Sequence, residues 1–408
     1  MRSWLVLMVL LANLGIFQPQ PAVQNALSFS NLSSDFRFGK DVTFYAKISP
    51  VEKIKDVFLF VQPGSDLTRT EKVSFDSSGE IVYRYDLGSK PLRPFVTINY
   101  WFRAVDANGQ QAQSNKQSFN YEDNRFTWQK LDEGIFQVRW ITGDLSFGQS
   151  ILNSAQQGLA SNASLLNTTV PNPLKIYVYP NSSDLQDALS LSQGSWVAGY
   201  TSPDLGVILV SIAPGPDQQV ELERQIPHEL MHIKIYQLAQ NKDVYQNLPA
   251  WLNEGLASLA ELTPNPDYQS ALTQSVKSNS LLSFTTICQA FPSDASGAFL
   301  AYAESVSFVS FIHQKYGSPA FQKLISSYKT GLGCSEGVNA ALGISLEQLE
   351  VRWRQEDLGM DTGALAVENL APYLISGLLL LTLPLAYVFF LKNKPKKEKA
   401  TAEAKNEL

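Results

Sequence analysis

The chain is poor in cysteine, because only two of its 408 residues, Cys288 and Cys334, are of this type. Two cysteines cannot build a disulfide framework, so the sequence leaves open one disulfide or two buried free thiols. Neither sign of charge dominates, since 32 Lys and Arg stand against 38 Asp and Glu, for a net charge of -6. This balance excludes a basic surface of the kind that binds nucleic acid. Histidine is also scarce, with three residues in the chain.

Two of the three histidines stand four residues apart, as His228 and His232, and Glu229 directly follows the first. This is the HExxH pattern. On a helix, a spacing of four places both imidazoles on one face, where they can bind the same metal ion. Glu229 lies one position further round the helix, so its carboxylate can reach a water molecule at the metal without binding the metal. The pattern therefore predicts a metal site with a general base beside it.

A zinc site that performs hydrolysis needs a third protein ligand and an open coordination position. Glu254 is the candidate, because it lies in a second predicted helix, residues 248–261, with Pro249 near the first turn and apolar residues at helical spacing. The alternative for Glu254 taken alone is a solvated helix residue. Its place after the HExxH pattern favours the ligand. A purely structural zinc site is disfavoured, since such sites prefer four protein ligands, often cysteines.

Three segments together resemble the gluzincin zinc peptidases, and most closely their peptidase-MA-like, thermolysin-like branch. They are the HExxH run at residues 226–232, the segment at 251–257 that contains WLNEG, and residues 301–317. The similarity extends over about residues 121–357 and does not include what precedes them. It implies an α+β metallopeptidase domain whose second half is helical.

The resemblance also implies a role for each matching residue. Zn2+ would be bound by His228, His232 and Glu254, and Glu229 would act as general base and later as proton donor. Many gluzincins carry an aspartate four residues after the glutamate ligand, where it orients a histidine.

This chain departs from that pattern, because Ser258 stands at the aspartate position. A serine cannot raise the basicity of an imidazole as a carboxylate does. Either Asn253, Glu261 or a backbone carbonyl takes over, or metal binding is weaker.

The resemblance further implies a Tyr or His that stabilises the oxyanion during hydrolysis. Tyr302 is the first candidate, because it lies on the helix after the ligand helix, and Tyr200 and His313 follow. The alternative for a tyrosine on an amphipathic helix is a core residue with its hydroxyl at the rim. His313 has the simpler interpretation of a surface histidine near the C-terminal end of a helix.

The two ends of the chain predict the compartment. Residues 1–26 have the charged start and short apolar core of a secretory signal peptide, with an uncleaved anchor as the alternative. Residues 371–391 form a run of 21 residues without a charge, long enough for a transmembrane helix. A linker, 358–370, precedes this run and a lysine-rich tail, 392–408, follows it. Basic residues remain in the cytoplasm, so we expect a type I single-pass membrane protein with its catalytic domain outside.

Residues 27–121 differ from the remainder, because β-branched and aromatic runs alternate there with turn signals such as Pro63-Gly64 and Asn108-Gly109. About seven short strands predict an immunoglobulin-like or fibronectin-like β-sandwich. No chemical motif lies in it. A spacer is the preferred role, and the sequence names no protein partner.

The peptidase region, 122–357, is predicted to have a sheet-bearing half, 122–240, with the HExxH helix, and a helical half, 241–357. In the resembled family the strand just before the metal helix forms the sheet edge. The run from Gly206 to Ser211 is therefore expected to hold a peptide or protein substrate by main-chain hydrogen bonds, with a buried strand as the alternative. Pro227 predicts that the metal helix either kinks or begins there.

Two hypotheses for the function follow. The first is a membrane-anchored extracytoplasmic zinc metallopeptidase that uses Glu229 as its base. The second is a non-catalytic cell-surface protein that binds a partner and keeps a peptidase-like scaffold. The intact Glu229 favours the first hypothesis, whereas the missing aspartate at Ser258 favours the second.

Overall fold

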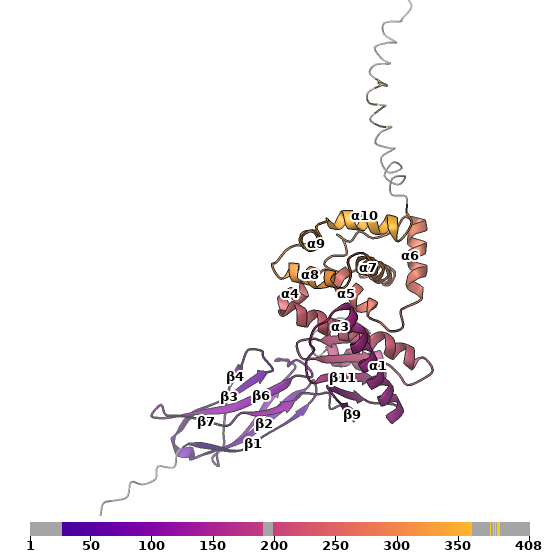
Figure 1. The fold of residues 1–408 in the computed structure, drawn as a ribbon. Helices are drawn as coiled ribbons and strands as arrows, with labels where there is room; N and C mark the ends of the chain where they lie inside the picture. Colours follow the sequence, from indigo (N-terminus) through magenta and orange to yellow (C-terminus); the bar gives the residue numbers. More distant parts are fainter. Residues whose placement is uncertain are drawn as a thin grey trace, which may run out of the picture. The chain divides into compact units, whose positions relative to one another are not determined.

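The computed structural model describes residues 27–190 and 199–360, together with residues 376, 378, 380, 382 and 383, which are helical (Figure 1). The predicted signal segment, the basic tail and most of the predicted transmembrane run lie outside these residues. The chain divides into two compact units, Met1–Thr127 with Gln186–Trp196 and Trp128–Leu185 with Val197–Leu408. Each unit has its own sheets and core.

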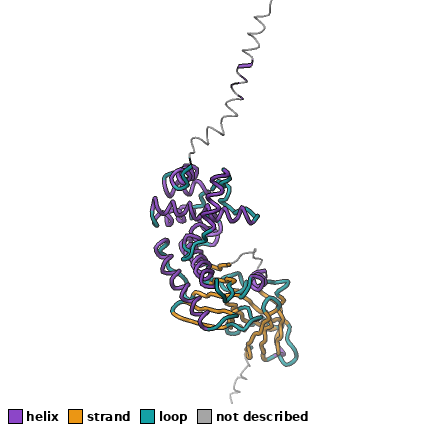
Figure 2. Tube along the Cα trace, turned by 90° about the vertical axis from the view of Figure 1, so that its right-hand side faces the viewer, coloured by secondary structure: helices purple, strands orange, loops and turns teal. Residues whose placement is uncertain are grey.

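The first unit is built from antiparallel sheets, so the predicted β-rich N-terminal region is confirmed (Figure 2). One sheet has the order β1-β2-β5, and the other has the order β4-β3-β6-β7 with β8 paired to β6. The strands are β1 (Ser28–Arg37), β2 (Asp41–Ser49), β3 (Ile54–Pro63), β4 (Arg69–Val73), β5 (Glu80–Asp86), β6 (Thr97–Asp106), β7 (Gln111–Gln113) and β8 (Gln117–Asn120), with a 3-10 turn at Val51–Lys53.

Alternation along the strands explains how these sheets pack. In β3 the side chains of Val57, Leu59 and Val61 are fully buried, because successive residues of a strand point to opposite faces. Phe44 of β2 meets Tyr100 of β6 with ring centroids 4.9 Å apart. These two strands belong to different sheets, so the sheets face each other across an aromatic core.

The second unit begins with a mixed five-stranded sheet of order β12-β13-β11-β10-β9. Its strands are β9 (Gln129–Glu133), β10 (Phe136–Trp140), β11 (Leu174–Tyr179), β12 (Gly199–Ser202) and β13 (Val207–Ser211). The three central strands β10, β11 and β13 are parallel, whereas β9 and β12 pair antiparallel with their neighbours. Helix α2 (Ser182–Ser190) lies between β11 and β12 in the sequence.

The prediction that the run from Gly206 to Ser211 forms the sheet edge is wrong. Strand β13 is paired with β11 on one side and with β12 on the other. Its central residues Ile208, Leu209 and Val210 are buried, as expected for an interior strand. Among the described strands, β12 forms the edge on this side of the sheet.

Two long helices, α1 (Leu145–Leu165) and α3 (Gln218–Ala239), share a buried apolar cluster with this sheet. Helix α3 continues through Pro227, so the HExxH helix does not begin there. Gly158 of α1 gives the proline its space, because a Cβ at this position would lie 2.8 Å from the Pro227 ring. The Asn162 amide donates to the Pro227 carbonyl at 2.9 Å. Helix α1 therefore packs closely against α3 where the proline interrupts it.

The remainder of the second unit is helical, as predicted (Figure 1). It contains α4 (Lys242–Gln246), α5 (Ala250–Leu259), α6 (Asp267–Ser278), α7 (Ala295–Tyr316), α8 (Pro319–Tyr328), α9 (Cys334–Leu342) and α10 (Leu346–Glu356). A disulfide joins Cys288 to Cys334, which settles the alternatives left open by the sequence. The core of this helical half includes Phe284 stacked on Phe308, with ring centroids 3.9 Å apart.

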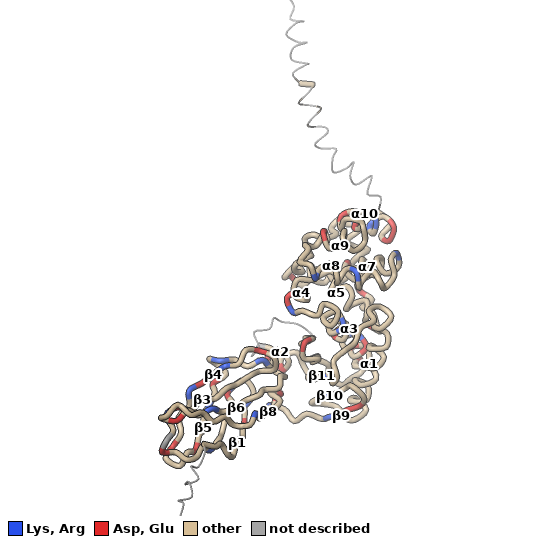
Figure 3. The backbone as a smooth tube through the Cα atoms, turned by 60° about the vertical axis from the view of Figure 1, so that its left-hand side comes forward, with Lys and Arg blue, Asp and Glu red and all other residues tan. Residues whose placement is uncertain are grey.

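Helix α7 is the one helix among the described residues that is long and apolar enough to cross a bilayer. Its residues Ala301, Phe308, Val309 and Ile312 are buried in the core of the helical half. Packing in this core accounts for its apolar character. In both units, basic and acidic residues are interspersed along the backbone and do not gather in regions of one sign (Figure 3).

Candidate metal centre

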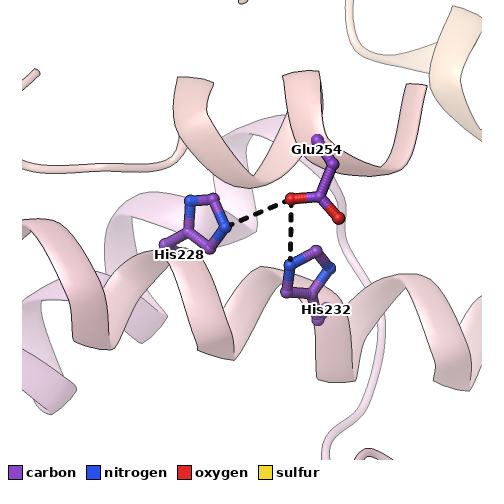
Figure 4. Close-up of side chains that lie close together, drawn as sticks. All are labelled: His228, His232 and Glu254. Carbon is purple, nitrogen blue, oxygen red and sulfur yellow. Dashed lines mark ion pairs between the residues drawn. The ribbon is translucent and has the colours of Figure 1, made fainter. Parts of the chain in front are cut away.

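Helix α3 presents His228 and His232 on one face, one turn apart, with ring centroids 5.0 Å apart. This follows from the helical spacing of four residues. Both imidazoles point toward the Glu254 carboxylate, which comes from the neighbouring helix α5 (Figure 4). The structure thus brings together the three residues that the sequence suggested as metal ligands.

Helix α5 is fixed in place at its first turn and along its apolar face. Pro249 is its N-cap residue, and the Ala250 N–H donates to the Cys288 carbonyl at 2.7 Å. Trp251 and Leu252 are fully buried in the core of the helical half. The hydrogen bond at the first turn and the buried apolar face fix the orientation of α5, so the Glu254 carboxylate is held toward α3.

The three side chains fit a single metal ion. The Glu254 Oε2 atom lies 3.6 Å from His228 Nε2 and 3.7 Å from His232 Nε2. One ligand atom from each residue lies within 4.8 Å of the other two. Tetrahedral ligands about 2.0–2.1 Å from zinc are separated by about 3.4 Å, so only a small adjustment would close the cluster on an ion. The donor set of two imidazoles and one carboxylate is suited to zinc.

The other ring nitrogen of each histidine has its own acceptor. His228 Nδ1 lies 3.1 Å from Glu261 Oε1, and His232 Nδ1 lies 3.2 Å from Asn253 Oδ1. Each contact favours the tautomer that carries its proton on Nδ1 and leaves Nε2 free to bind a metal. The buried Ser258 hydroxyl takes no part in these two contacts. Two of the substitutes suggested for the missing aspartate, Asn253 and Glu261, are thus both found at the histidines.

The electrostatics of the cluster favour a cation. Burial lowers the pKa of His228, but hydrogen bonds to Glu254 and Glu261 outweigh burial and raise this pKa to about 10. Burial raises the pKa of Glu254, whereas the charge of His232 and contacts with His228 and Tyr302 lower it to about 2. The carboxylates therefore hold a positive charge between them. When a divalent cation is absent, a proton on the imidazole supplies this positive charge, and a bound cation can take its place.

Glu229 lies beside the cluster but is turned toward strand β12. Its side chain is 7% exposed, and its Oε2 accepts a hydrogen bond from the Thr201 hydroxyl. Gly199, two residues earlier on the same strand, lies against the other carboxylate oxygen, because an added Cβ would come within 2.3 Å of Oε1. The sequence analysis missed both residues. A glycine and a threonine two positions apart on a strand carry no recognisable signal without knowledge of which helix they face.

Tyrosines surround the cluster. Tyr302 lies close enough to the Glu254 carboxylate to help lower its pKa, and burial and the charges of Glu254 and Glu229 raise the pKa of the Tyr302 phenol. Tyr245, which the sequence analysis also missed, lies near Asn253, and its pKa is raised by burial and by the charge of Glu254. Tyr200 lies near Tyr245. Tyr302 thus remains close to the place where chemistry would occur.

His313 lies outside this cluster. It is about three turns further along α7 than Tyr302. Its Nε2 lies 3.1 Å from the Ser318 hydroxyl, and its ring stacks on Phe321. These contacts join the end of α7 to α8, which is a structural role.

The sequence profile of the Peptidase MA superfamily matches residues 154–357, which is half of the chain. The chain belongs to this superfamily. The matched segment runs from the middle of α1 to the end of α10 and includes the HExxH helix, Glu254 and Tyr302. The suspected family is therefore confirmed. No curated protein matches the chain.

Several solved structures share limited similarity with this Peptidase MA protein. A β-1,3-glucan binding domain of carbohydrate-binding module family 56 has 16% sequence identity and a TM-score of 0.17, and the match covers 23% of this chain and 99% of that one. A polysaccharide deacetylase from Bacillus cereus has 8% identity and a TM-score of 0.19, with 40% and 54% covered. A purple acid phosphatase from yellow lupin has 8% identity and a TM-score of 0.21, with 49% and 40% covered. These scores are too low to assign a fold or a ligand to this chain.

Proposed function

We propose that this Peptidase MA protein is a membrane-anchored, extracytoplasmic zinc metallopeptidase. The observation that carries the proposal is the convergence of His228 Nε2, His232 Nε2 and a Glu254 oxygen on one point, with Glu229 beside it. Three protein ligands leave a fourth position open, which distinguishes a catalytic zinc site from a structural one. A zinc ion held there would supply Lewis-acid chemistry for hydrolysis near neutral pH.

Glu229 is suited to the role of general base. Its carboxylate is held between Thr201 and Gly199, next to the ligand cluster, and is not among the ligands. In this position it can accept a proton from the attacking water and return it to the leaving amine. The Tyr302 hydroxyl is suited to donating a hydrogen bond to the developing oxyanion.

The position of strand β12 at the edge of the described sheet supports a route for the peptide substrate. An extended peptide can add to an edge strand by main-chain hydrogen bonds. This strand also carries Thr201 and Gly199, which contact Glu229. A peptide paired with β12 would therefore lie next to the general base, which moves the predicted substrate strand from the run starting at Gly206 to Gly199–Ser202.

The cellular setting belongs to the same proposal. The charge-free run at 371–391 and the lysines after it support a single transmembrane helix with a cytoplasmic tail, and residues 1–26 support secretion. Two facing antiparallel sheets support an immunoglobulin-like or fibronectin-like domain at 27–121, followed by the peptidase domain at 122–357. In this arrangement the β domain acts as a spacer.

The decisive experiment compares the full chain with its Glu229→Gln variant in casein hydrolysis and in zinc content per chain. We expect one zinc per chain in both proteins. Hydrolysis should fall by about 10²- to 10⁴-fold in the variant, because general acid–base catalysis contributes about this much. Glutamine keeps the shape of the side chain but cannot accept the proton.

The matched control is Glu221→Gln, the same substitution in the first turn of the same helix. Glu221 contacts Arg224 and Gln225 and is not among the ligand-cluster residues. This variant should retain wild-type hydrolysis. Equal hydrolysis by wild type and Glu229→Gln would exclude Glu229 as the base, and a zinc-free wild-type chain would exclude the metal centre.

A further inference from the structure

Pro227 leaves one carbonyl of helix α3 without its usual partner. Proline has no N–H, so the Glu223 carbonyl, four residues earlier, cannot receive the hydrogen bond that residue 227 donates in a regular helix. The Leu262 N–H donates to this carbonyl instead, at 2.9 Å. Leu262 follows the end of α5, so the interruption of α3 creates an attachment point for a different segment.

Two side chains strengthen the same attachment. The Thr263 hydroxyl donates to a Glu223 carboxylate oxygen at 2.6 Å. The Arg224 guanidinium donates to the Thr263 carbonyl at 3.4 Å. The segment at residues 261–263 is therefore bound to α3 at Glu223 and Arg224, about one turn before the first metal-binding histidine.

The attachment determines where Glu261 lies. This residue directly precedes Leu262, is 9% exposed, and places its Oε1 3.1 Å from His228 Nδ1. Its second oxygen has no hydrogen bond, and the Arg224 Nε atom lies 3.9 Å from it. The carboxylate is thus directed mainly at the histidine. Ser258, on α5 itself, cannot supply this negative charge.

We propose that Pro227 and Glu261 act together as a positioning device for His228. The carbonyl released by Pro227 anchors the segment at 261–263, and Glu261 then holds the imidazole with Nε2 directed at the metal position. A carboxylate on the outer nitrogen also makes the imidazole a stronger metal ligand. His232 receives only the neutral amide of Asn253, so the device acts on one of the two histidines. This inference rests on the metal centre proposed above.

The test measures the zinc affinity of the full chain by competition with a chelator. Glu261→Ala should weaken zinc binding by about 10- to 100-fold, the usual effect of losing such a partner. Glu261→Gln keeps a hydrogen-bond acceptor and should recover part of the loss. Pro227→Ala should weaken binding by about fivefold, because the new N–H competes for the Glu223 carbonyl. This variant should not unfold at a lower temperature, because alanine favours the helix.

The double variant Pro227→Ala/Glu261→Ala tests whether the two residues affect zinc affinity together or independently. If Pro227 acts through Glu261, the double variant should bind zinc as Glu261→Ala does, with no further loss. The matched control is Glu350→Ala, which removes an equally buried glutamate that contacts Phe284 and Arg354, outside the metal centre. Its folded form should keep wild-type zinc affinity.

Each outcome has a separate meaning. Unchanged zinc affinity in Glu261→Ala would overturn the inference while leaving the metal centre intact. Additive losses in the double variant would remove Pro227 from the device. A wild-type chain that binds no zinc would instead overturn the proposed function itself.

Discussion

One buried carboxylate of the first unit and one of the helical half of the second unit differ in how their charge is treated. Asp41 of the first unit is 4% exposed and is paired with both Arg37 and Arg84, and this pairing lowers its pKa to about 2. Glu304 of α7 is fully buried, and burial raises its pKa to about 8. One of its oxygens accepts from the Leu282 N–H at 3.0 Å, and the other has no partner.

The difference is between a buried charge that stabilises the folded state and one that destabilises it. A buried carboxylate without a cation beside it destabilises the folded state, and such groups are concentrated near functional sites. Glu304 is two residues from Tyr302 on α7, so the two side chains leave the helix on different sides. The neighbours of Glu304 are the Leu282 N–H and the charged groups of Arg354 and Glu350. We infer that α7 loses stability by burying Glu304, whereas the first unit neutralises the charge that it buries at Asp41.

The largest effect in this comparison is expected for Tyr302→Phe. If the half-buried Tyr302 hydroxyl serves chemistry, its loss should lower kcat by about 10²- to 10³-fold, the usual cost of removing one oxyanion donor. Zinc content and thermal stability should change little. The measurement is steady-state hydrolysis of a peptide substrate together with metal analysis.

Tyr121→Phe in the first unit is the matched control. Its hydroxyl accepts a hydrogen bond from the Gly39 N–H at 2.7 Å. This variant should lower the stability of the first unit by about 1–3 kcal/mol, because the half-buried Gly39 N–H loses its acceptor, and should leave kcat unchanged. A Tyr302→Phe variant with wild-type kcat would remove this tyrosine from the proposed chemistry.

The sequence alone predicted the parts of the centre that depend on local spacing. His228 and His232 share a helix face because they are four residues apart, and Glu254 lies on a helix with its own apolar pattern. Parts that depend on long-range pairing could not be predicted. The order of β12 and β13 in the sheet is one such part, and the contact of Thr201 with Glu229 follows from it.

The contacts around Pro227 also depend on long-range packing that the sequence does not show. The sequence indicated a kink or a helix start, because both follow from the missing N–H. It could not indicate which donor would take the released Glu223 carbonyl, since Leu262 is distant in the sequence and is brought there by the packing of α5 against α3. The choice of Glu261 over Asn253 for His228 depends on that packing as well.

A second effect is expected for Glu304→Gln and depends on pH. Folding raises the pKa of Glu304 from 4.5 to about 8, so the folded state binds the proton more tightly. Its stabilising contribution is complete below pH 4.5 and is lost as the pH rises to about 8. Glutamine removes this dependence. At pH 8 the variant should therefore be more stable than wild type, by on the order of 4 kcal/mol.

Hydrogen exchange of peptides from α7 measures this effect, because it reports on the helical half separately from the first unit. The free energy of opening should fall between pH 4.5 and 8 in wild type and stay nearly level in the variant. Parallel pH profiles for the two proteins would show that Glu304 has the same pKa in the folded and the opened state. The contrast with Asp41 would then disappear.

The smallest effect, with the opposite sign, is expected for Asp41→Asn. Folding lowers the pKa of Asp41 from 3.8 to about 2, because Arg37 and Arg84 stabilise its charge. Its contribution is therefore present above pH 3.8 and is lost as the pH falls to about 2. Both arginines are more than half exposed, at 59% and 66% of their side chains. Solvent screening should thus limit the loss in the variant to about 1 kcal/mol near neutral pH.

Hydrogen exchange of peptides from β2 and β5 at several pH values tests this prediction. Wild type should lose protection in these strands as the pH falls through 3.8, whereas the asparagine variant should start lower and change less. Because the Glu304 contribution is lost in the opposite direction of pH, the two units should diverge in stability at both ends of the range. Loss of protection in β2 on raising the pH from 4.5 to 8 would contradict the proposed contrast between Asp41, whose charge stabilises the fold, and Glu304, whose charge destabilises it.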